Sequence, residues 1–467
     1  MKRYLIIILV SLFFISCEDN LDRIPNDTLV AETAYQNLED LDQGLNGVYT
    51  GLNLNNTIEF NSIFTDNCKL GTNNGGQALN LLNQILNTQT NSAGIWNNRY
   101  SVANRANRIL AASEIINYDV NDENQVAQYE NIIGQTYALR AFAHFEVLTY
   151  YAEDLLDPSS LGIVYQTEVN QEGQPVRLTT GESIQAILDD LDMAESLISE
   201  GQNNKSFVTK DFVTFVRARL ALYTGDYPEA QERATDIINS YALANQDQYQ
   251  AMFSGSDRTE VIFAYEARQG FNRNIANLWI FTGTGGNFVG MSNELFDELA
   301  AAGDVRFAVN FNPDSDLGDG EIGINKYPGS GGQFVNDFKA MRASEAYLIR
   351  AEAYAKQNQF QLAADDVQTV RNARSNASAN ASAYSSLNEA LRDILAERRL
   401  ELCFEGHRYV DLKRYRIDLN EGLERDPRDC DGNIPCSIPV GDRRWTFPIP
   451  QGELNANTNI QQNPQWL

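Results

Sequence analysis

Residues 217–238 read RARLALYTGDYPEAQERATDII, and residues 350–371 read RAEAYAKQNQFQLAADDVQTVR. Aligned from their Arg-Ala starts, the two stretches place Ala230 over Ala363 and Tyr227 over Phe360. In each stretch, apolar residues recur at helical spacing on both sides of a short polar turn. The pattern predicts a hairpin of two helices that occurs at least twice in the chain.

These hairpins resemble tetratricopeptide repeats, which carry small residues where their two helices cross and an aromatic residue after the turn. Arg140-Ala141 opens a third partial copy. The tryptophan and proline positions of that repeat are not all met, so ordinary amphipathic hairpins with chance alanines are the alternative. Helical periodicity extends over residues 31–52, 95–116, 124–151, 183–198, 210–241, 340–374 and 387–404.

Gly- and Asn-rich or β-prone stretches separate these segments, at 64–77, 261–290 and 310–332 and from 426 onward. We therefore expect a mainly α fold, with a tetratricopeptide-like helical superhelix and an irregular, loop-rich lobe that contains short strands. Because 467 residues exceed what one core usually serves, we expect two closely packed regions, 31–255 and 256–467.

The N-terminus carries the pattern of a secretory signal peptide. Two basic residues precede an apolar run from Leu5 to Ile15, which is shorter than the roughly 20 residues of a membrane-spanning helix. The following stretch, Phe14-Ile15-Ser16-Cys17, resembles a bacterial lipobox. We expect residues 1–16 to be removed, Cys17 to be acylated with palmitate-type chains, and residues 17–30 to form a lipidated tether. Ordinary signal-peptide cleavage with an incidental Cys17 is the alternative.

The chain is strongly acidic, with a formal net charge of −27. Loss of residues 1–16 removes Lys2 and Arg3, which leaves 34 basic against 63 acidic residues and a net charge of −29. Such a field repels nucleic acid and anionic lipid heads, so nucleic acid is excluded as a partner.

Four cysteines remain after Cys17. Cys430 and Cys436 flank a turn-forming stretch, DCDGNIPC, and we expect a local disulfide between them in an oxidising compartment. Cys403 lies in an apolar helical stretch and is expected to be a buried free thiol. With two histidines and no Cys-x-x-Cys, the chain has little material for a zinc site.

Glu397, Glu401 and Glu405 fall on one face of a helix within the densest charged stretch. One interpretation makes two of them an acid and base pair, as in glycoside hydrolysis, but those carboxylates normally flank a cleft. The favoured interpretation is a structural ion-pair lattice, in which the nearby Arg398, Arg399, Arg408 and Arg414 neutralise them. No catalytic residue is predicted, because His144 and His407 lie in helical and ion-pair surroundings without a nucleophile partner.

The same stretch resembles the C-terminal signature of the SusD/RagB family. The matching residues are Glu397-Arg398, Glu401-Leu402, Glu405-Gly406, Arg408, Asp411-Leu412, the later Phe447-Pro448-Ile449-Pro450 and Gln462-Asn463-Pro464. Trp96, Tyr100, Asn104 and Asn107 resemble the family's early helix, Leu139-Arg140-Ala141 its second, and Ala351-Glu352-Ala353 its repeat helix. Glu18, Asp19 and Asn20 resemble the acidic export signal of surface lipoproteins of the Bacteroidetes type.

The resemblance implies a non-enzymatic lipoprotein on the outer face of the outer membrane. Such a protein binds a nutrient, usually a glycan and sometimes a peptide, for a SusC-like TonB-dependent transporter that it covers as a lid. A surface glycosidase and a pure protein scaffold are the alternatives.

Ligand candidates come from loop aromatics and polar side chains, since sugar rings stack on aromatics while amides and carboxylates bind hydroxyls. Trp279, Phe281 and Phe288 flank a Gly-rich loop and could form a stacking platform or a buried strand. Trp96 could contact the ligand or could pack in the hydrophobic core, and the sequence leaves both alternatives open. The remaining candidates, Asp66, Asn67, Asn73 and Asn74, could bind hydroxyls or simply form turns.

Two acidic stretches bear on metal binding. One stretch resembles a calcium-binding loop through the carboxylates of Asp314, Asp316, Asp319 and Glu321. Its glycine is shifted by one position from the glycine of the EF-hand loop. The stretch from Asp429 is similar. We favour solvated acidic turns at both places, so no metal site and no cofactor are predicted, with calcium as the alternative.

Overall fold

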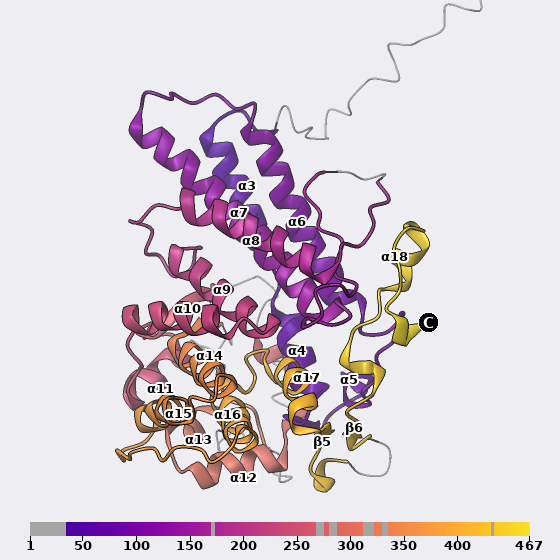
Figure 1. The fold of residues 1–467 in the computed structure, drawn as a ribbon, viewed down its shortest axis with the longest axis vertical. Coiled ribbons are helices and arrows are strands. Elements are labelled where there is room, and N and C mark those ends of the chain that lie inside the picture. Colours follow the sequence, from indigo (N-terminus) through magenta and orange to yellow (C-terminus); the bar gives the residue numbers. More distant parts are fainter. Residues whose placement is uncertain are drawn as a thin grey trace, which may run out of the picture.

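The computed structural model describes residues 34–169, 173–267, 275–279, 287–311, 322–328, 335–430 and 434–467. Helices dominate these residues, and the strands are short and paired two by two (Figure 1). The predicted mainly α, tetratricopeptide-like fold with short strands is therefore confirmed. The predicted signal peptide, Cys17 and the tether lie outside the described residues.

Four long helices form the N-terminal part: α3 (Leu38–Gly51), α6 (Ala93–Ser113), α7 (Glu123–Tyr151) and α8 (Thr180–Leu197). α7 packs against the other three (Figure 1). The start of α8 is fixed by a capping box, in which the side chains of Thr179 and Glu182 satisfy each other's backbone N–H groups. The short α4 (Asn55–Ile63) and α5 (Leu79–Leu82) lie between α3 and α6 in the sequence.

The repeated sequence forms two helical hairpins, α9 (Lys210–Thr224) with α10 (Tyr227–Ser240) and α14 (Ala343–Lys356) with α15 (Phe360–Arg374). Gly225 ends α9 in the left-handed conformation at φ 83°, which favours glycine, and Asp226 caps α10. α10 packs on α14, so the two hairpins adjoin although about 100 residues separate them. The crossing residues Ala230, Ala351 and Ala363 are all fully buried.

The partial third copy belongs to the pair α7 and α8. Arg140 binds Asp190 of α8 through two hydrogen bonds of 2.7 Å, and Arg350 binds Asp366 of α15 in the same bidentate way at 2.7 and 2.8 Å. In both pairs an Arg-Ala arginine therefore ties the first helix to the second.

The remaining helices are α11 (Gln246–Ser254), α12 (Asn293–Ala302), α13 (Val305–Asn310), α16 (Leu387–Leu402), α17 (Arg408–Leu419) and α18 (Gln451–Ala456). Among the described residues, two antiparallel strand pairs join distant segments: β1 (Cys68–Leu70) with β3 (Val289–Met291), and β2 (Val261–Tyr265) with β4 (Phe338–Arg342). A third pair joins β5 (Leu423–Glu424) to the nearby β6 (Ser437–Ile438).

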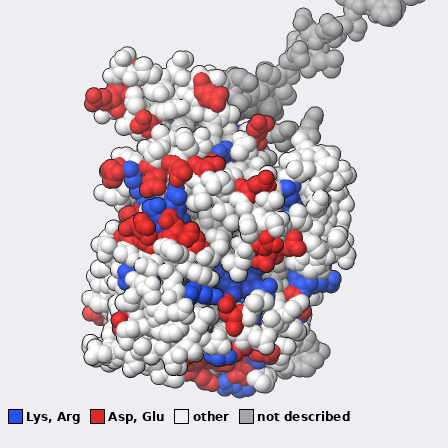
Figure 2. All heavy atoms as spheres, in the orientation of Figure 1, with Lys and Arg blue, Asp and Glu red and all other residues white. Residues whose placement is uncertain are grey.

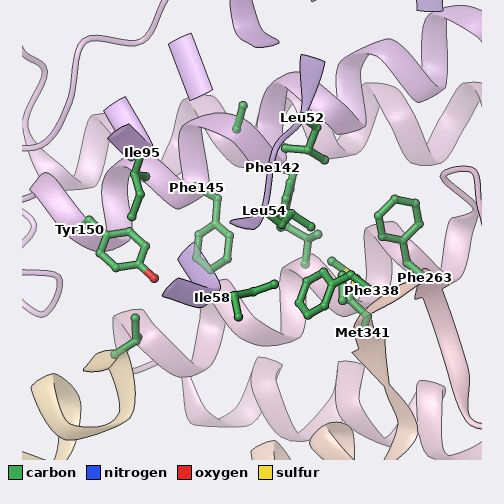
Figure 3. Packing of buried hydrophobic residues seen from close by; sticks show 14 of the residues in the cluster. Leu52, Leu54, Ile58, Ile95, Phe142, Phe145, Tyr150, Phe263, Phe338 and Met341 are labelled. Atoms are coloured by element: carbon green, nitrogen blue, oxygen red, sulfur yellow. The ribbon is translucent and has the colours of Figure 1, made fainter. Parts of the chain in front are cut away.

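One large hydrophobic core connects the N-terminal helices to the strands. Phe142 and Phe145 of α7 lie beside Leu54 and Ile58, with Phe338 and Met341 of β4 below them (Figure 3). A smaller cluster lies between α14, α15, α16 and α17. Because the large core takes residues from both ends of the chain, the C-terminal segment is held against the N-terminal helices.

Charged side chains of both signs cover the surface of α8, α9 and α10 (Figure 2). Ion pairs there include Arg217 with Asp192 and Arg233 with Glu229. Among the described residues, no helix combines the length and the apolar character needed to cross a membrane.

Candidate functional site

A cleft of about 940 Å³ lies between the N-terminal half of α6, the segments 164–168 and 173–175 that follow α7, and the C-terminal segment 453–460 with α18. We name it the Trp96 cleft. Its lining is aromatic and polar: Trp96, Tyr100 and Tyr165, the amides of Asn97, Asn104, Gln166, Gln174 and Asn457, the hydroxyls of Ser101 and Thr167, and the carboxylates of Glu168 and Glu453. Such a concave site with few oriented polar groups is typical of small-ligand binding.

Trp96 forms part of the floor of this cleft. Only 3% of its surface is exposed, and its ring lies 4.6 Å from that of Tyr100 and 5.0 Å from that of Tyr151. The Tyr151 hydroxyl accepts the Trp96 backbone N–H at 3.1 Å and donates to the Ser92 carbonyl, which fixes the start of α6. None of the described residues accepts a hydrogen bond from the Trp96 indole N–H. The indole is therefore rigidly held with its donor available.

The helical repeat of α6 turns a row of its side chains towards the cleft. Trp96, Tyr100 and Asn104 are spaced by four residues and line the cleft together. Tyr100 donates its hydroxyl to the Val164 carbonyl at 2.9 Å, so it also holds the opposite wall in place.

A buried polar network beneath that wall fixes the segment 164–168. Asn107 donates to the carbonyls of Gln166 and Glu168 at 3.0 and 3.3 Å. Its own amide oxygen accepts from Arg140 at 2.7 Å. Tyr165 donates its hydroxyl to Asp190 at 2.5 Å, and Asp190 is the partner of Arg140. A loop that would otherwise be free is thus tied to α6, α7 and α8.

His144 completes this network. Its Nε2 accepts the Gln166 backbone N–H at 3.0 Å, so its Nδ1 carries the proton that is shared with the Arg140 carbonyl at 3.0 Å. The ring stacks on Tyr165 with centroids 4.0 Å apart. Burial, together with the charge of Arg140, lowers the pKa of His144 to about 3. The imidazole is neutral and structural, which agrees with the sequence argument against a catalytic histidine.

The C-terminal segment forms the other side of the cleft. Arg177 donates to the carbonyls of Gly162, Gln461, Tyr151 and Leu161 and to Asn463 Oδ1. Burial lowers the pKa of Arg177 to about 10. Asn457 donates to the Pro175 carbonyl at 2.8 Å, and Asn459 to the Gln174 carbonyl at 2.8 Å. The sequence motif around Asn463 therefore seats the chain end against the cleft wall.

Two of the three aromatic residues of the predicted platform, Trp279 and Phe288, are buried. Trp279 is 1% exposed, packs against Phe404 with ring centroids 5.6 Å apart, and has no hydrogen-bond acceptor for its indole N–H among the described residues. Phe288 is also buried, and its backbone N–H donates to the Trp279 carbonyl at 3.0 Å. Phe281 lies outside the described residues. The buried alternative therefore holds for both described aromatics.

The predicted polar ligand residues near β1 do not line the cleft. Asp66 is buried, and although burial opposes ionisation, Arg399 and Arg408 hold its pKa well below the usual range. Asn67 accepts from Arg399 at 3.2 Å. Asn74 donates to the carbonyls of Gln77 and Phe288, and the exposed Asn73 forms a backbone hydrogen bond with Asn287. The side chains of Asp66, Asn67 and Asn74 stabilise the fold, because their polar atoms bind other residues of the same chain.

Glu397, Glu401 and Glu405 form the predicted ion-pair lattice, which we name the glutamate lattice. The partners come from other elements and not from the neighbouring arginines, which corrects that part of the prediction. Glu397 pairs with Arg306 at 2.6 Å, Glu401 with Arg342 and Arg374 at 2.8 and 2.9 Å, and Glu405 with Arg342 and Lys326 at 2.8 and 2.6 Å. Arg398, Arg399, Arg408 and Arg414 instead bind Asp411, Asp66 and Glu352.

Cys430 and Cys436 are joined by a disulfide, while Cys68 and Cys403 are buried free thiols. No three His, Cys, Asp or Glu side chains of the described residues gather into a group that could hold a metal ion. The acidic stretch from Asp314 to Glu321 lies outside the described residues.

Comparison with known families supports the resemblance noted in the sequence. The model described as "SusD family" matches residues 324–466, and one described as "Starch-binding associating with outer membrane" matches residues 19–221. Together, the two matches support assignment of this chain to the SusD/RagB family. The first match contains the glutamate lattice and α18, and the second contains α6 and Trp96.

Two curated SusD-like proteins of Formosa agariphila are similar to it. SusD-like protein P2 is 24% identical and SusD-like protein P38 is 24% identical, with alignments that cover 99% and 87% of this chain and 99% and 90% of theirs.

Solved structures share the fold. A putative sugar-binding protein from Bacteroides vulgatus superposes with a TM-score of 0.78 at 23% identity, over 93% of this chain and 100% of its own. A laminarin-binding SusD-like protein superposes with a TM-score of 0.67 at 19% identity, over 92% and 100% of the two chains.

Proposed function

We propose that this protein is an outer-membrane lipoprotein that binds a glycan in the Trp96 cleft and delivers it to a SusC-like TonB-dependent transporter. The observation that carries the proposal is the cleft, in which a rigid aromatic floor lies beneath amides, hydroxyls and carboxylates. Sugar rings offer C–H faces to such a floor and hydroxyls to such a lining. Its volume of about 940 Å³ falls at the upper end of the roughly 300–1,000 Å³ that is usual for ligand pockets.

The comparisons support a saccharide over other ligands. The model that matches residues 19–221 is described as starch-binding, and one structural relative is described as laminarin-binding. The residues that line the cleft from α6 and from the segments 164–168 and 173–175 fall inside that matched region.

A binding role fits the carboxylates better than an enzymatic one. Glu397, Glu401 and Glu405 are paired and buried in the core, so they cannot act as an acid and base pair on a ligand in the cleft. We propose neither catalysis nor a cofactor.

In this proposal, acylated Cys17 holds the protein at the extracellular face of the outer membrane, and the transporter carries the ligand across. The acidic surface and the tether at residues 17–30 suit a soluble domain that opens and closes over a membrane partner.

Affinity electrophoresis of the purified protein against a panel of polysaccharides, laminarin and starch included, tests the ligand. We expect at least one polysaccharide to retard the protein, and Trp96→Leu to weaken the retardation. Retardation of a folded Trp96→Leu variant that equals that of the parent would place the site elsewhere. Binding of peptides alone, release of reducing ends, or no binding to any polysaccharide would instead favour a peptide carrier, a glycosidase or a scaffold.

Purification of the native lipoprotein from outer membranes in mild detergent, followed by mass spectrometry, tests the partner. We expect a SusC-like transporter to copurify. The lipoprotein recovered alone, under conditions that preserve other membrane complexes, would contradict the delivery step. Replacement of Cys17 by alanine should also release the protein from the detergent phase.

A further inference from the structure

Two carboxylates face the Trp96 cleft without partners. Glu168 comes from the segment after α7, and Glu453 comes from α18. Neither side chain makes an ion pair or a hydrogen bond with any described residue, although most carboxylates buried in this protein do. Each is at least partly exposed, so each is available to a ligand.

Cationic side chains are scarce around these carboxylates. None of the described residues that line the cleft is Lys or Arg. The buried Arg140 is saturated by Asp190 and Asn107, and Arg177 by five acceptors of the chain itself. Arg108 borders the cleft, where its Nε donates to Asn104 at 3.1 Å. Arg177 has only neutral acceptors and keeps its charge, but it is buried and does not line the cleft. The charged side chains that line the cleft itself are therefore the two carboxylates, with Arg108 bound to the lining residue Asn104.

This charge bears on the class of ligand. Carboxylates accept hydrogen bonds from hydroxyl groups, which every neutral saccharide carries in number. A sulfate or uronate group brings no such donor, and its charge meets the like charge of the cleft in a partly enclosed site, where water screens it less than in bulk. The net charge of the whole chain, −27, opposes an anionic ligand as well.

We propose that the cleft selects uncharged saccharides and excludes sulfated and uronate-containing ones, with Glu168 and Glu453 as the residues that set this preference. The inference rests on the glycan-binding function proposed above.

The first experiment compares neutral polysaccharides (laminarin, starch, xylan, galactomannan) with anionic ones (alginate, carrageenan) and with a chemically sulfated form of the strongest neutral ligand. We expect binding to the neutral set, and binding to the sulfated form that is weaker by roughly tenfold or more, with a gap that narrows as salt screens the charges. Anionic ligands that bind as tightly as neutral ones would overturn the selectivity and leave glycan binding intact. No binding to any saccharide would refute the proposed function and the inference with it.

The second experiment uses the double variant Glu168→Gln with Glu453→Gln, which keeps the shape and one acceptor oxygen of each side chain and removes the charge. We expect the affinity for the sulfated form to rise by roughly tenfold, and the affinity for the neutral form to change by less than about threefold. The double variant Glu114→Gln with Glu123→Gln is the matched control, because it changes net charge equally at exposed positions at the far end of α6 and the start of α7. An equal gain in the control, or no gain in the cleft variant, would overturn the assignment of these two residues.

Discussion

The Trp96 cleft and the glutamate lattice are built from the same kinds of side chain, yet their surroundings give them opposite roles. In the lattice, every carboxylate meets an arginine or lysine at 2.9 Å or less, and the three side chains are 0–1% exposed. In the cleft, Glu168 and Glu453 have no partner among the described residues and line an open volume.

The tryptophans differ in the same way. Trp96 is 3% exposed and Trp279 is 1% exposed, so burial alone does not separate them. Trp96 borders the cleft, whereas Trp279 is covered by Phe404. Trp279 also lacks an acceptor for its indole N–H, so an unpaired donor does not separate them either. The comparison teaches that a candidate binding residue is recognised by whether it borders an open volume, and not by its residue type or its exposed fraction.

The largest effect is expected from Glu401→Ala, which breaks the lattice. The variant leaves Arg342 and Arg374 buried without one of their charge partners, and breaking a buried pair in this way typically costs about 3–5 kcal/mol. Chemical denaturation should show this loss, while Glu453→Ala in the cleft should change the free energy of unfolding by less than about 0.5 kcal/mol. Similar losses in both variants would contradict the contrast between the two regions.

Trp279→Ala should be the next most damaging change. Replacing a buried tryptophan by alanine costs about 3–5 kcal/mol, and we expect the lower end because the indole N–H loses no acceptor. Calorimetry should show the lower stability, and the glycan affinity of the folded fraction should equal that of the parent. Weaker glycan binding by a fully folded Trp279→Ala protein would restore the platform that the sequence suggested.

Trp96→Leu should have the opposite effect to Trp279→Ala, with a clear loss of glycan affinity and a small loss of stability. The leucine keeps apolar contact with Tyr151 but removes the ring and the indole N–H, so we expect a loss of about 1–3 kcal/mol in binding, measured by titration calorimetry. Its loss of stability should be smaller than that of Trp279→Ala. Parent-like affinity in the leucine variant would remove Trp96 from the site.

Much of the fold could be predicted from the sequence, because periodicity and small crossing residues act locally. The hairpins at 217–238 and 350–371 follow from spacing alone. Spacing also placed Glu397 and Glu401 on one helical face, whereas the prediction was wrong for Glu405, which lies in the turn after α16 ends at Leu402. It could not name their partners, since Arg306, Arg342 and Arg374 come from three other elements.

The site was harder to predict. The family resemblance pointed to Trp96, but the other wall of the cleft comes from 164–168, from 173–175 and from the C-terminal segment 453–460, which meet α6 only through tertiary contacts. Nothing in the sequence next to Glu168 or Glu453 indicates that these carboxylates would lack a partner. Trp279 misled because a Gly-rich neighbourhood suggests a loop, whereas Phe404, more than 100 residues away, covers the ring.

The smallest effect, and the sharpest test of how the cleft wall is held, is expected from His144→Phe. The variant keeps the stack on Tyr165 but removes the acceptor of the Gln166 N–H, so at pH 7 it should lose about 1 kcal/mol of stability. Glycan affinity should fall a few-fold as the segment 164–168 loosens, and His144→Gln, which restores an acceptor, should recover part of it.

The stability difference between the parent and the His144→Phe variant should depend on pH. Unfolded His144 takes up a proton below about pH 6.5. In the folded protein its pKa is lowered to about 3. The unfolded state therefore binds more protons between these values, and the parent loses up to about 1.4 kcal/mol of stability per pH unit as the pH falls through that window. The phenylalanine variant lacks this loss, so its deficit should shrink and then reverse between pH 7 and pH 4. Denaturation curves whose difference stays constant over that range would show that His144 does not hold the wall as a buried neutral acceptor.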